Sequence, residues 1–91
     1  MELTITKTRG AWTFGTLTAD NGEEYRFEVK HFEQPSQWGL DWDGEPGRIS
    51  KLWVTRARTF GTVCAYDRGW DKLPRNEVDQ DACAAIIERF N

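Results

Sequence analysis

The sequence predicts an α+β protein in which a five-stranded, mostly antiparallel meander sheet packs on one face against a single C-terminal helix. Two observations indicate the sheet: short stretches of alternating polar and apolar residues, or of threonine and aromatic residues, follow one another up to residue 67, and turn-forming dipeptides such as Asn21-Gly22 separate them. The third observation indicates the helix. Beyond Pro74 the apolar residues recur every three or four positions, which is typical of an amphipathic helix.

The first three expected strands cover residues 2–8, 11–18 and 23–32. The third has the clearest pattern, because its apolar and charged residues alternate strictly and one of its faces must therefore meet water. Its inward-facing residues are expected to be Tyr25, Phe27, Val29 and His31. Between the second and third strands, Asn21-Gly22 tolerates the positive φ of a type I′ turn and predicts a hairpin.

The fourth expected strand, residues 48–56, is the centre of the predicted sheet. Leu52 and Val54 lie on one of its faces, and Ile49 and Trp53 lie on the other. A strand with apolar groups on both faces requires cover on both sides. We therefore expect the helix over one face and a loop, or a curled sheet, over the other.

The fifth strand is expected at residues 60–67 and the helix at residues 77–89, with Asn76 as its N-cap. Acidic residues near its start and Arg89 near its end suit the helix dipole. The expected buried positions of the helix are Val78, Ala82, Cys83, Ile86, Ile87 and Phe90. A partly closed barrel capped by the helix is the alternative architecture.

Length and composition indicate a single domain over residues 1–91 with a net charge of −3. No apolar run is long enough to span a bilayer and no signal-peptide core is visible, so we expect a cytoplasmic protein without membrane contact, in the host cytoplasm if a phage encodes it. The two cysteines, Cys64 and Cys83, fit a reducing compartment as buried thiols. A strand-to-helix disulfide between them is the alternative.

Residues 33–47 are expected to form a loop, because they contain two prolines and three glycines. A loop of this length is often functional, and this one carries Trp38 and Trp42. We favour the interpretation that both indoles fold back over the sheet face that carries Trp53. The alternative is that one of them is a contact anchor for a partner, since Trp dominates interface hot spots.

Four basic residues, Arg48, Lys51, Arg56 and Arg58, lie in positions 46–66 without any acidic residue among them. The rest of the chain has eight basic and fifteen acidic residues. Neutralisation by acids on neighbouring strands, such as Glu24 or Glu28, is the interpretation we favour. The alternative is a contact patch for an acidic partner, and the candidate partner-binding residues are then Trp38, Trp42, Arg48, Lys51, Arg56 and Arg58.

No catalytic, cofactor-binding or metal-binding motif is present, so an enzyme is not expected. The single histidine, His31, has no companion at metal-ligand spacing and is expected to be a hydrogen-bonded core residue. The alternatives are a His31/Cys64 dyad, a calcium-loop fragment at residues 41–45, and an acid/base pair formed by Asp67 and Asp71.

Residues 48–58 place Trp53 between Lys51 and Arg56, an arrangement that can stack and hold single-stranded nucleic acid. The acidic remainder of the chain would repel phosphates. Nucleic-acid binding is therefore kept as the alternative to binding a protein.

The stretches Gly47–Val54 and Tyr66–Asp71, with Phe27–Lys30 and Pro35-Ser36-x-x-Gly39 upstream, resemble a family of short uncharacterised proteins from bacteria and their phages. The resemblance covers roughly residues 12–90, and this chain departs from the pattern in a longer 40–47 loop. The resemblance implies a phage or mobile-element context, in which small acidic proteins often bind and block a host protein. We therefore expect a non-enzymatic interaction protein that binds a host or phage protein, with anti-defence or anti-CRISPR inhibition as one form of that activity.

Overall fold

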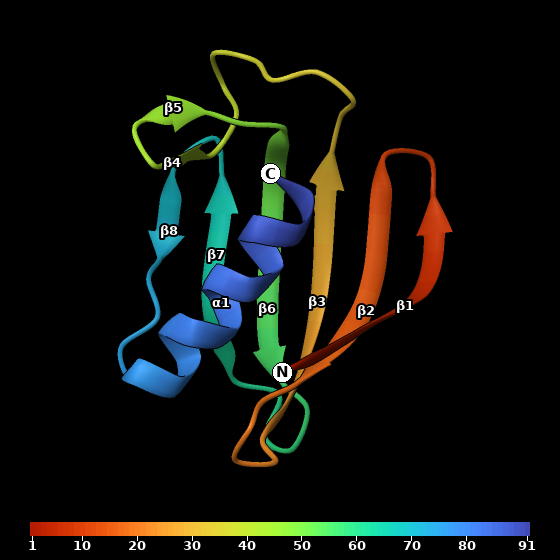
Figure 1. The fold of residues 1–91 in the computed structure, drawn as a ribbon, viewed down its shortest axis with the longest axis vertical. Coiled ribbons are helices and arrows are strands. Elements are labelled where there is room, and N and C mark those ends of the chain that lie inside the picture. Colours follow the sequence, from red (N-terminus) through yellow and green to blue (C-terminus); the bar gives the residue numbers. More distant parts are fainter.

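The computed structural model describes residues 1–91 and consists of one six-stranded sheet, one short hairpin and one helix (Figure 1). The sheet order is β1 (Glu2–Arg9), β2 (Trp12–Thr18), β3 (Glu24–His31), β6 (Ile49–Arg56), β7 (Thr62–Asp67) and β8 (Trp70–Lys72). Every neighbouring pair is antiparallel. The hairpin pairs β4 (Asp41–Trp42) with β5 (Glu45–Pro46), and α1 (Glu77–Phe90) ends the chain. The expected α+β class with a meander sheet and C-terminal helix is confirmed, and the sheet has a sixth strand.

The sixth strand exists because the chain reverses tightly after β7. Arg68 adopts a left-handed φ of 59°, and the Asp67 N–H donates to the Gly69 carbonyl at 2.9 Å. The chain therefore returns alongside β7 as β8, whereas the expected sheet ended with the strand at residues 60–67.

The hairpin predicted at Asn21-Gly22 is present, but its turn differs from the expected type. Only Gly22 has a positive φ, at 89°, and its N–H donates to the Ala19 carbonyl at 2.9 Å. The connection is thus longer than a two-residue type I′ turn. Gly22 supplies its one left-handed position and follows the turn that this hydrogen bond closes.

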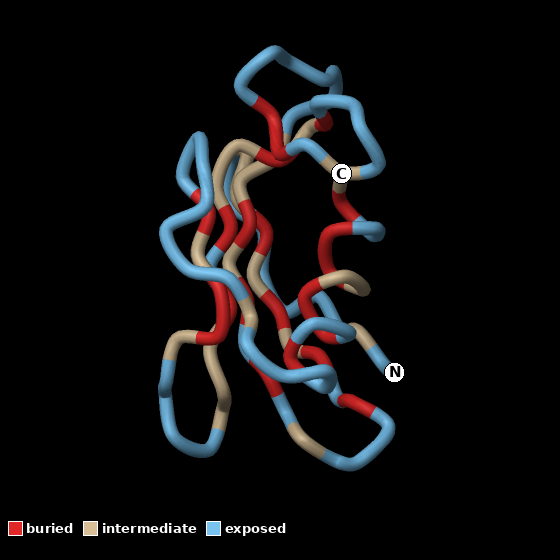
Figure 2. Tube along the Cα trace, turned by 90° about the vertical axis from the view of Figure 1, so that its left-hand side faces the viewer, coloured by how far each residue is buried: buried red, intermediate tan, exposed pale blue.

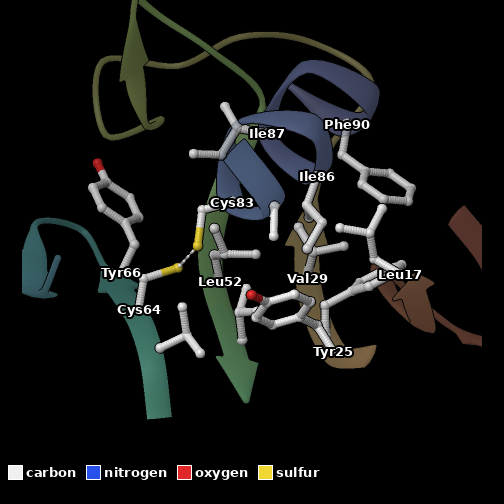
Figure 3. Packing of buried hydrophobic residues seen from close by; sticks show 14 of the residues in the cluster. Leu17, Tyr25, Val29, Leu52, Cys64, Tyr66, Cys83, Ile86, Ile87 and Phe90 are labelled. Atoms are coloured by element: carbon white, nitrogen blue, oxygen red, sulfur yellow. Dashed lines mark hydrogen bonds between the residues drawn. The ribbon is translucent and has the colours of Figure 1, made fainter. Parts of the chain in front are cut away.

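The core lies between the sheet and α1, which runs along one face of the sheet only (Figure 2). Tyr25 and Val29 of β3 point toward the helix (Figure 3). Phe27 of the same strand is also buried, and its ring lies 5.6 Å from that of Phe90 in α1. Burial of such aromatic and aliphatic groups supplies most of the stability of a domain this small.

The start of α1 confirms Asn76 as the N-cap, because its side-chain oxygen accepts a 2.9 Å hydrogen bond from the Asp79 N–H. Val78 was expected to be buried but is 36% exposed, whereas its neighbour Asp79 is buried, with an exposure of 4%. The reason is that Tyr25 and Arg56 both donate to the Asp79 carboxylate, so the first turn directs this polar residue toward the sheet.

We expected Ile49 and Trp53 on the same face of the central strand, and this is wrong because the register of the strand shifts between them. Lys30 pairs with Lys51, but His31 pairs with Ile49, so Ser50 is an additional residue in β6. This bulge turns Ile49 toward the helix, where it is fully buried, and leaves Trp53 on the opposite side.

The sheet face that carries Trp53 has no cover, since the Trp53 side chain is 49% exposed. The expectation that this strand is covered on both sides is therefore wrong. The barrel alternative is not realised either, because β1 and β8 remain separate edges of an open sheet.

Residues 33–47 contain a hairpin where a loop without regular structure was expected. Asp43 and Gly44, with φ values of 61° and 87°, form its two-residue turn. The segment lies at the end of the sheet near the C-terminus of α1 (Figure 1), where Leu40 is buried and its carbonyl accepts from the Asn91 amide at 3.1 Å. It closes the end of the core and leaves the Trp53 face free.

Candidate functional site

The candidate site is the sheet surface opposite α1, which we call the open face. Cross-strand register places its side chains in three rows over β2, β3, β6 and β7. The middle row consists of Phe14, Glu28, Trp53 and Ala65; one neighbouring row consists of Trp12, Lys30, Lys51 and Asp67, and the other of Thr16, Arg26, Thr55 and Thr62. The open face thus carries three aromatic residues of these rows together with charges of both signs.

The aromatic residues of the open face are held in place by local contacts. The Trp53 indole N–H donates to the Thr62 hydroxyl at 3.2 Å, and the Trp12 and Phe14 rings stack with centroids 6.2 Å apart. Phe60, 71% exposed after β6, lies 5.8 Å from the Arg26 guanidinium. Exposed aromatic residues that gather on one face can mark an interaction site.

Two hollows lie on the open face, and Trp53 lines both of them. The first, which we call the Trp12 hollow, has a volume of about 230 Å³. Its lining residues are Trp12, Glu28, Lys51, Leu52, Trp53, Ala65, Tyr66, Asp67 and Asp71. The second, the Phe60 hollow, measures about 620 Å³ and is lined by Thr6, Phe14, Gly15, Thr16, Arg26, Phe27, Glu28, Trp53, Thr55 and Phe60.

The Trp12 hollow is acidic, because three carboxylates and one ammonium group line it. Lys51 Nζ lies 3.9 Å from an Asp67 oxygen, and both side chains are well exposed. An exposed pair at this distance is weak. Asp67 and Asp71 therefore remain able to accept from another cation.

Of the six predicted partner-binding residues, Lys51 is the one that lies on the open face. Arg56 pairs with Asp79 on the helix side of the sheet, and its guanidinium is 3.7 Å from Glu23. Arg58 is also 3.7 Å from Glu23. Acids do neutralise these cations, but they are Glu23 and Asp79 and not the expected Glu24 or Glu28.

The other three candidates lie at the end of the sheet. The Arg48 Nε donates to the Asn91 backbone carbonyl at 3.3 Å, and Trp42 packs against the core. Trp38 is 61% exposed, with its carbonyl 3.5 Å from the Tyr66 hydroxyl. The six residues therefore do not form one surface, and the basic window of the sequence is divided among three places.

His31 is a packed histidine, as expected. Its Nε2 lies 3.0 Å from the Thr13 hydroxyl, and its ring lies 5.1 Å from that of Phe90. Burial, followed by the charges of Arg48 and Arg89, lowers the pKa of His31. No dyad with Cys64 forms, because the partner of Cys64 is Cys83.

Cys64 and Cys83 are buried free thiols whose sulfur atoms lie 2.7 Å apart, joining β7 to α1 (Figure 3). The hydrogen bond with Cys64, with burial in addition, raises the pKa of the Cys83 thiol. A thiol with a raised pKa in an apolar site is a poor nucleophile. The pair therefore belongs to the core.

Sequence reasoning missed the contribution of Trp12, Glu28, Asp67 and Asp71 to one hollow. Each of these residues lies on a different strand, so only the register between strands brings them together. One signal was present: the two stretches that carry the family resemblance, Gly47–Val54 and Tyr66–Asp71, supply most of the lining of the Trp12 hollow.

Comparison with known proteins gives one match. The model of a family described as a domain of unknown function (DUF7678) matches residues 11–91. No curated protein and no solved structure matches the chain. The helix α1 is not long and apolar enough to cross a membrane. Since the family model spans nearly all of the sheet and the whole helix, the chain belongs to the DUF7678 family of uncharacterised domains.

Proposed function

We propose that this protein is a non-enzymatic interaction protein that binds a host or phage protein through the open face of its sheet. The observation that carries the proposal is Trp53, which is 49% exposed at the centre of the sheet and lines two hollows. A large aromatic residue in a hollowed surface is the usual anchor of a protein interface. A stable fold does not need it there, since the core lies on the opposite face.

The carboxylates around Trp53 favour a protein over a nucleic acid. Glu28 lies in the central row beside Trp53, and Asp67 and Asp71 line the adjacent hollow, so phosphates would meet carboxylates. Arg56, which the nucleic-acid hypothesis requires, pairs with Asp79 away from this face, and Arg58 lies beside Glu23 rather than beside Trp53.

One observation still favours single-stranded nucleic acid, because an exposed indole can stack a base. Basic groups that accompany Trp53 on this face are Lys7, Arg26, Lys30 and Lys51. Fluorescence titration with a single-stranded oligonucleotide at low salt separates the two functions. Quenching of tryptophan emission that salt reverses would favour nucleic acid, and unchanged emission supports the protein partner.

The biological role that we propose follows from the family resemblance and the acidic character of the chain. A protein of 91 residues with a net charge of −3 can cover a functional surface of a larger host protein and block it. Host-defence nucleases and CRISPR effectors are targets of the kind that phages inhibit, and such inhibition would take place in the host cytoplasm.

Affinity capture from host lysate with matched variants tests the proposal. The wild-type protein is expected to retain a stoichiometric partner that Trp53→Ala no longer retains. Gln80→Ala, an exposed change on the far side of α1, is the control and is expected to capture as the wild type does. Loss of capture in Trp38→Ala but not in Trp53→Ala would move the interface to the 33–47 segment and contradict the proposed surface.

A further inference from the structure

We infer that the Trp12 hollow is a binding site for an arginine side chain of the protein partner. The inference rests on the proposed function, because it names the chemistry that the open face recognises. The size of the hollow, its aromatic walls and its charge all suit this side chain.

The size of the Trp12 hollow suits one side chain. Its volume of about 230 Å³ lies below the roughly 300 Å³ at which pockets for whole small molecules begin. Five of its nine lining residues are hydrophobic, among them both indoles. A long side chain with an apolar stem can therefore fill it, whereas a cofactor or nucleotide cannot.

The walls of the hollow select a flat cation. Trp12 and Trp53 present aromatic surface, and the two belong to strands that are separated by β3. A guanidinium group stacks on indole faces more favourably than an ammonium group, and its planar fork matches carboxylates. Arginine is therefore favoured over lysine.

Charge complementarity supports the same occupant. Glu28, Asp67 and Asp71 line the hollow against the single Lys51, a net charge of −2. Lys30 is the other cation in the row that contains Trp12, Lys51 and Asp67. Its Nζ lies 5.7 Å from the Phe32 ring, and it does not line the hollow. An arginine entering the hollow would satisfy Asp67 and Asp71, whose side chains are exposed in the free protein.

Lys51 acts as an internal competitor for this site. It lies 3.9 Å from Asp67 and shares the hollow with it, so its positive charge repels a second cation that approaches Asp67. Replacing Lys51 by an uncharged residue of similar length is therefore expected to strengthen arginine binding. A merely apolar docking surface would not respond in this way.

The test uses N-acetyl-arginine methylamide as the probe, with N-acetyl-citrulline methylamide as its neutral isostere. Both are titrated into the isotope-labelled protein while NMR follows the indole N–H signals. The arginine probe is expected to shift the Trp12 and Trp53 signals saturably, with a Kd in the millimolar range, about −4 kcal/mol, as suits a fragment. An equal response to citrulline, or shifts at other tryptophans only, would overturn the inference.

Variants of the charged lining residues test which of them binds the guanidinium of the probe. Asp67→Asn combined with Asp71→Asn is expected to weaken the arginine probe about three- to tenfold, and Lys51→Met to strengthen it about twofold or more, in line with the worth of exposed ion pairs. Glu77→Gln, a charge change on α1 outside the hollow, is the matched control. An unchanged Kd in the double variant would overturn the inference.

The same variants keep this inference separable from the proposed function. If Trp53→Ala abolishes capture of the partner while the double Asp variant captures it fully, the open face is the interface but arginine recognition is wrong. If the arginine probe binds as expected while Trp53→Ala leaves capture unchanged, the hollow recognises arginine but the proposed interface fails.

Discussion

The Tyr25 hydroxyl donates a 2.7 Å hydrogen bond to the Asp79 carboxylate, joining the sheet to the first turn of the helix across 54 residues. Arg56 donates to the same carboxylate, and the Asn76 amide lies 3.0 Å from it. Burial, together with the hydrogen bond to Asp79, raises the pKa of Tyr25 well above its ordinary value. One buried carboxylate thus positions α1 on the sheet.

Replacing this carboxylate is expected to destabilise the fold strongly. Asp79→Ala leaves the Tyr25 hydroxyl and the Arg56 guanidinium without their partner, so the free energy of unfolding should fall by about 3–5 kcal/mol. Urea denaturation measures this change. Asp81→Ala, an exposed acid of the same helix, is the control and should stay within about 0.5 kcal/mol of the wild type. Equal stability of the two variants would contradict the role of Asp79.

Truncation of Leu52 is expected to cost much more stability than truncation of its neighbour Trp53, because the two residues lie on opposite faces of β6. Leu52→Ala removes a buried side chain and should cost about 2–5 kcal/mol of stability. Trp53→Ala removes an exposed indole with one hydrogen bond and should cost about 1 kcal/mol or less. Thermal denaturation compares the two. A Trp53→Ala protein as unstable as Leu52→Ala would show that Trp53 serves the fold.

The lowered pKa of His31 predicts a pH dependence of stability. Because the folded protein holds this proton less tightly than the unfolded chain, stability is fully present above the unfolded pKa of about 6.5 and decreases as pH falls through the lower folded pKa. His31→Gln keeps a polar partner for Thr13 but cannot titrate. The wild type should therefore lose more stability than this variant on going from about pH 7 to pH 5. Parallel pH profiles of the two proteins would contradict the prediction.

The two thiols are expected to be unreactive in the folded protein. Cys64 and Cys83 are buried against each other, and the raised pKa of Cys83 disfavours its thiolate. Iodoacetamide should label neither in buffer and both in concentrated guanidinium, as read by mass spectrometry. Ser36→Cys, which adds an exposed thiol, verifies that the reagent is active. Rapid labelling of Cys64 or Cys83 in buffer would contradict their burial.

The elements of this fold were predictable because their signals are local. The alternation of Tyr25, Phe27 and Val29 placed β3 correctly, and Asn76 marked the start of α1. The hairpin in residues 33–47 was predictable in principle, since Asp43-Gly44 is a typical two-residue turn. The two prolines and three glycines of this segment favoured a loop without regular structure instead, with a calcium-loop fragment at residues 41–45 as one alternative.

The candidate site was not predictable in the same way. The sequence placed Arg48, Lys51, Arg56 and Arg58 in one basic window, whereas strand register and the acids of other elements separate them. The Trp12 hollow joins residues from β2, β3, β6, β7 and β8, and no local pattern states which of them become neighbours.

The sequence by itself determined the class of the protein, the positions of β1, β2, β3, β6 and β7, and the start of α1, because hydrophobic period and capping act over a few residues. The tertiary structure alone decided which face of the sheet stays open. One additional residue in β6, Ser50, turns Ile49 toward the helix and leaves Trp53 on the opposite face. Neither α1 nor the 33–47 segment covers Trp53, and this depends on contacts between residues far apart in the chain.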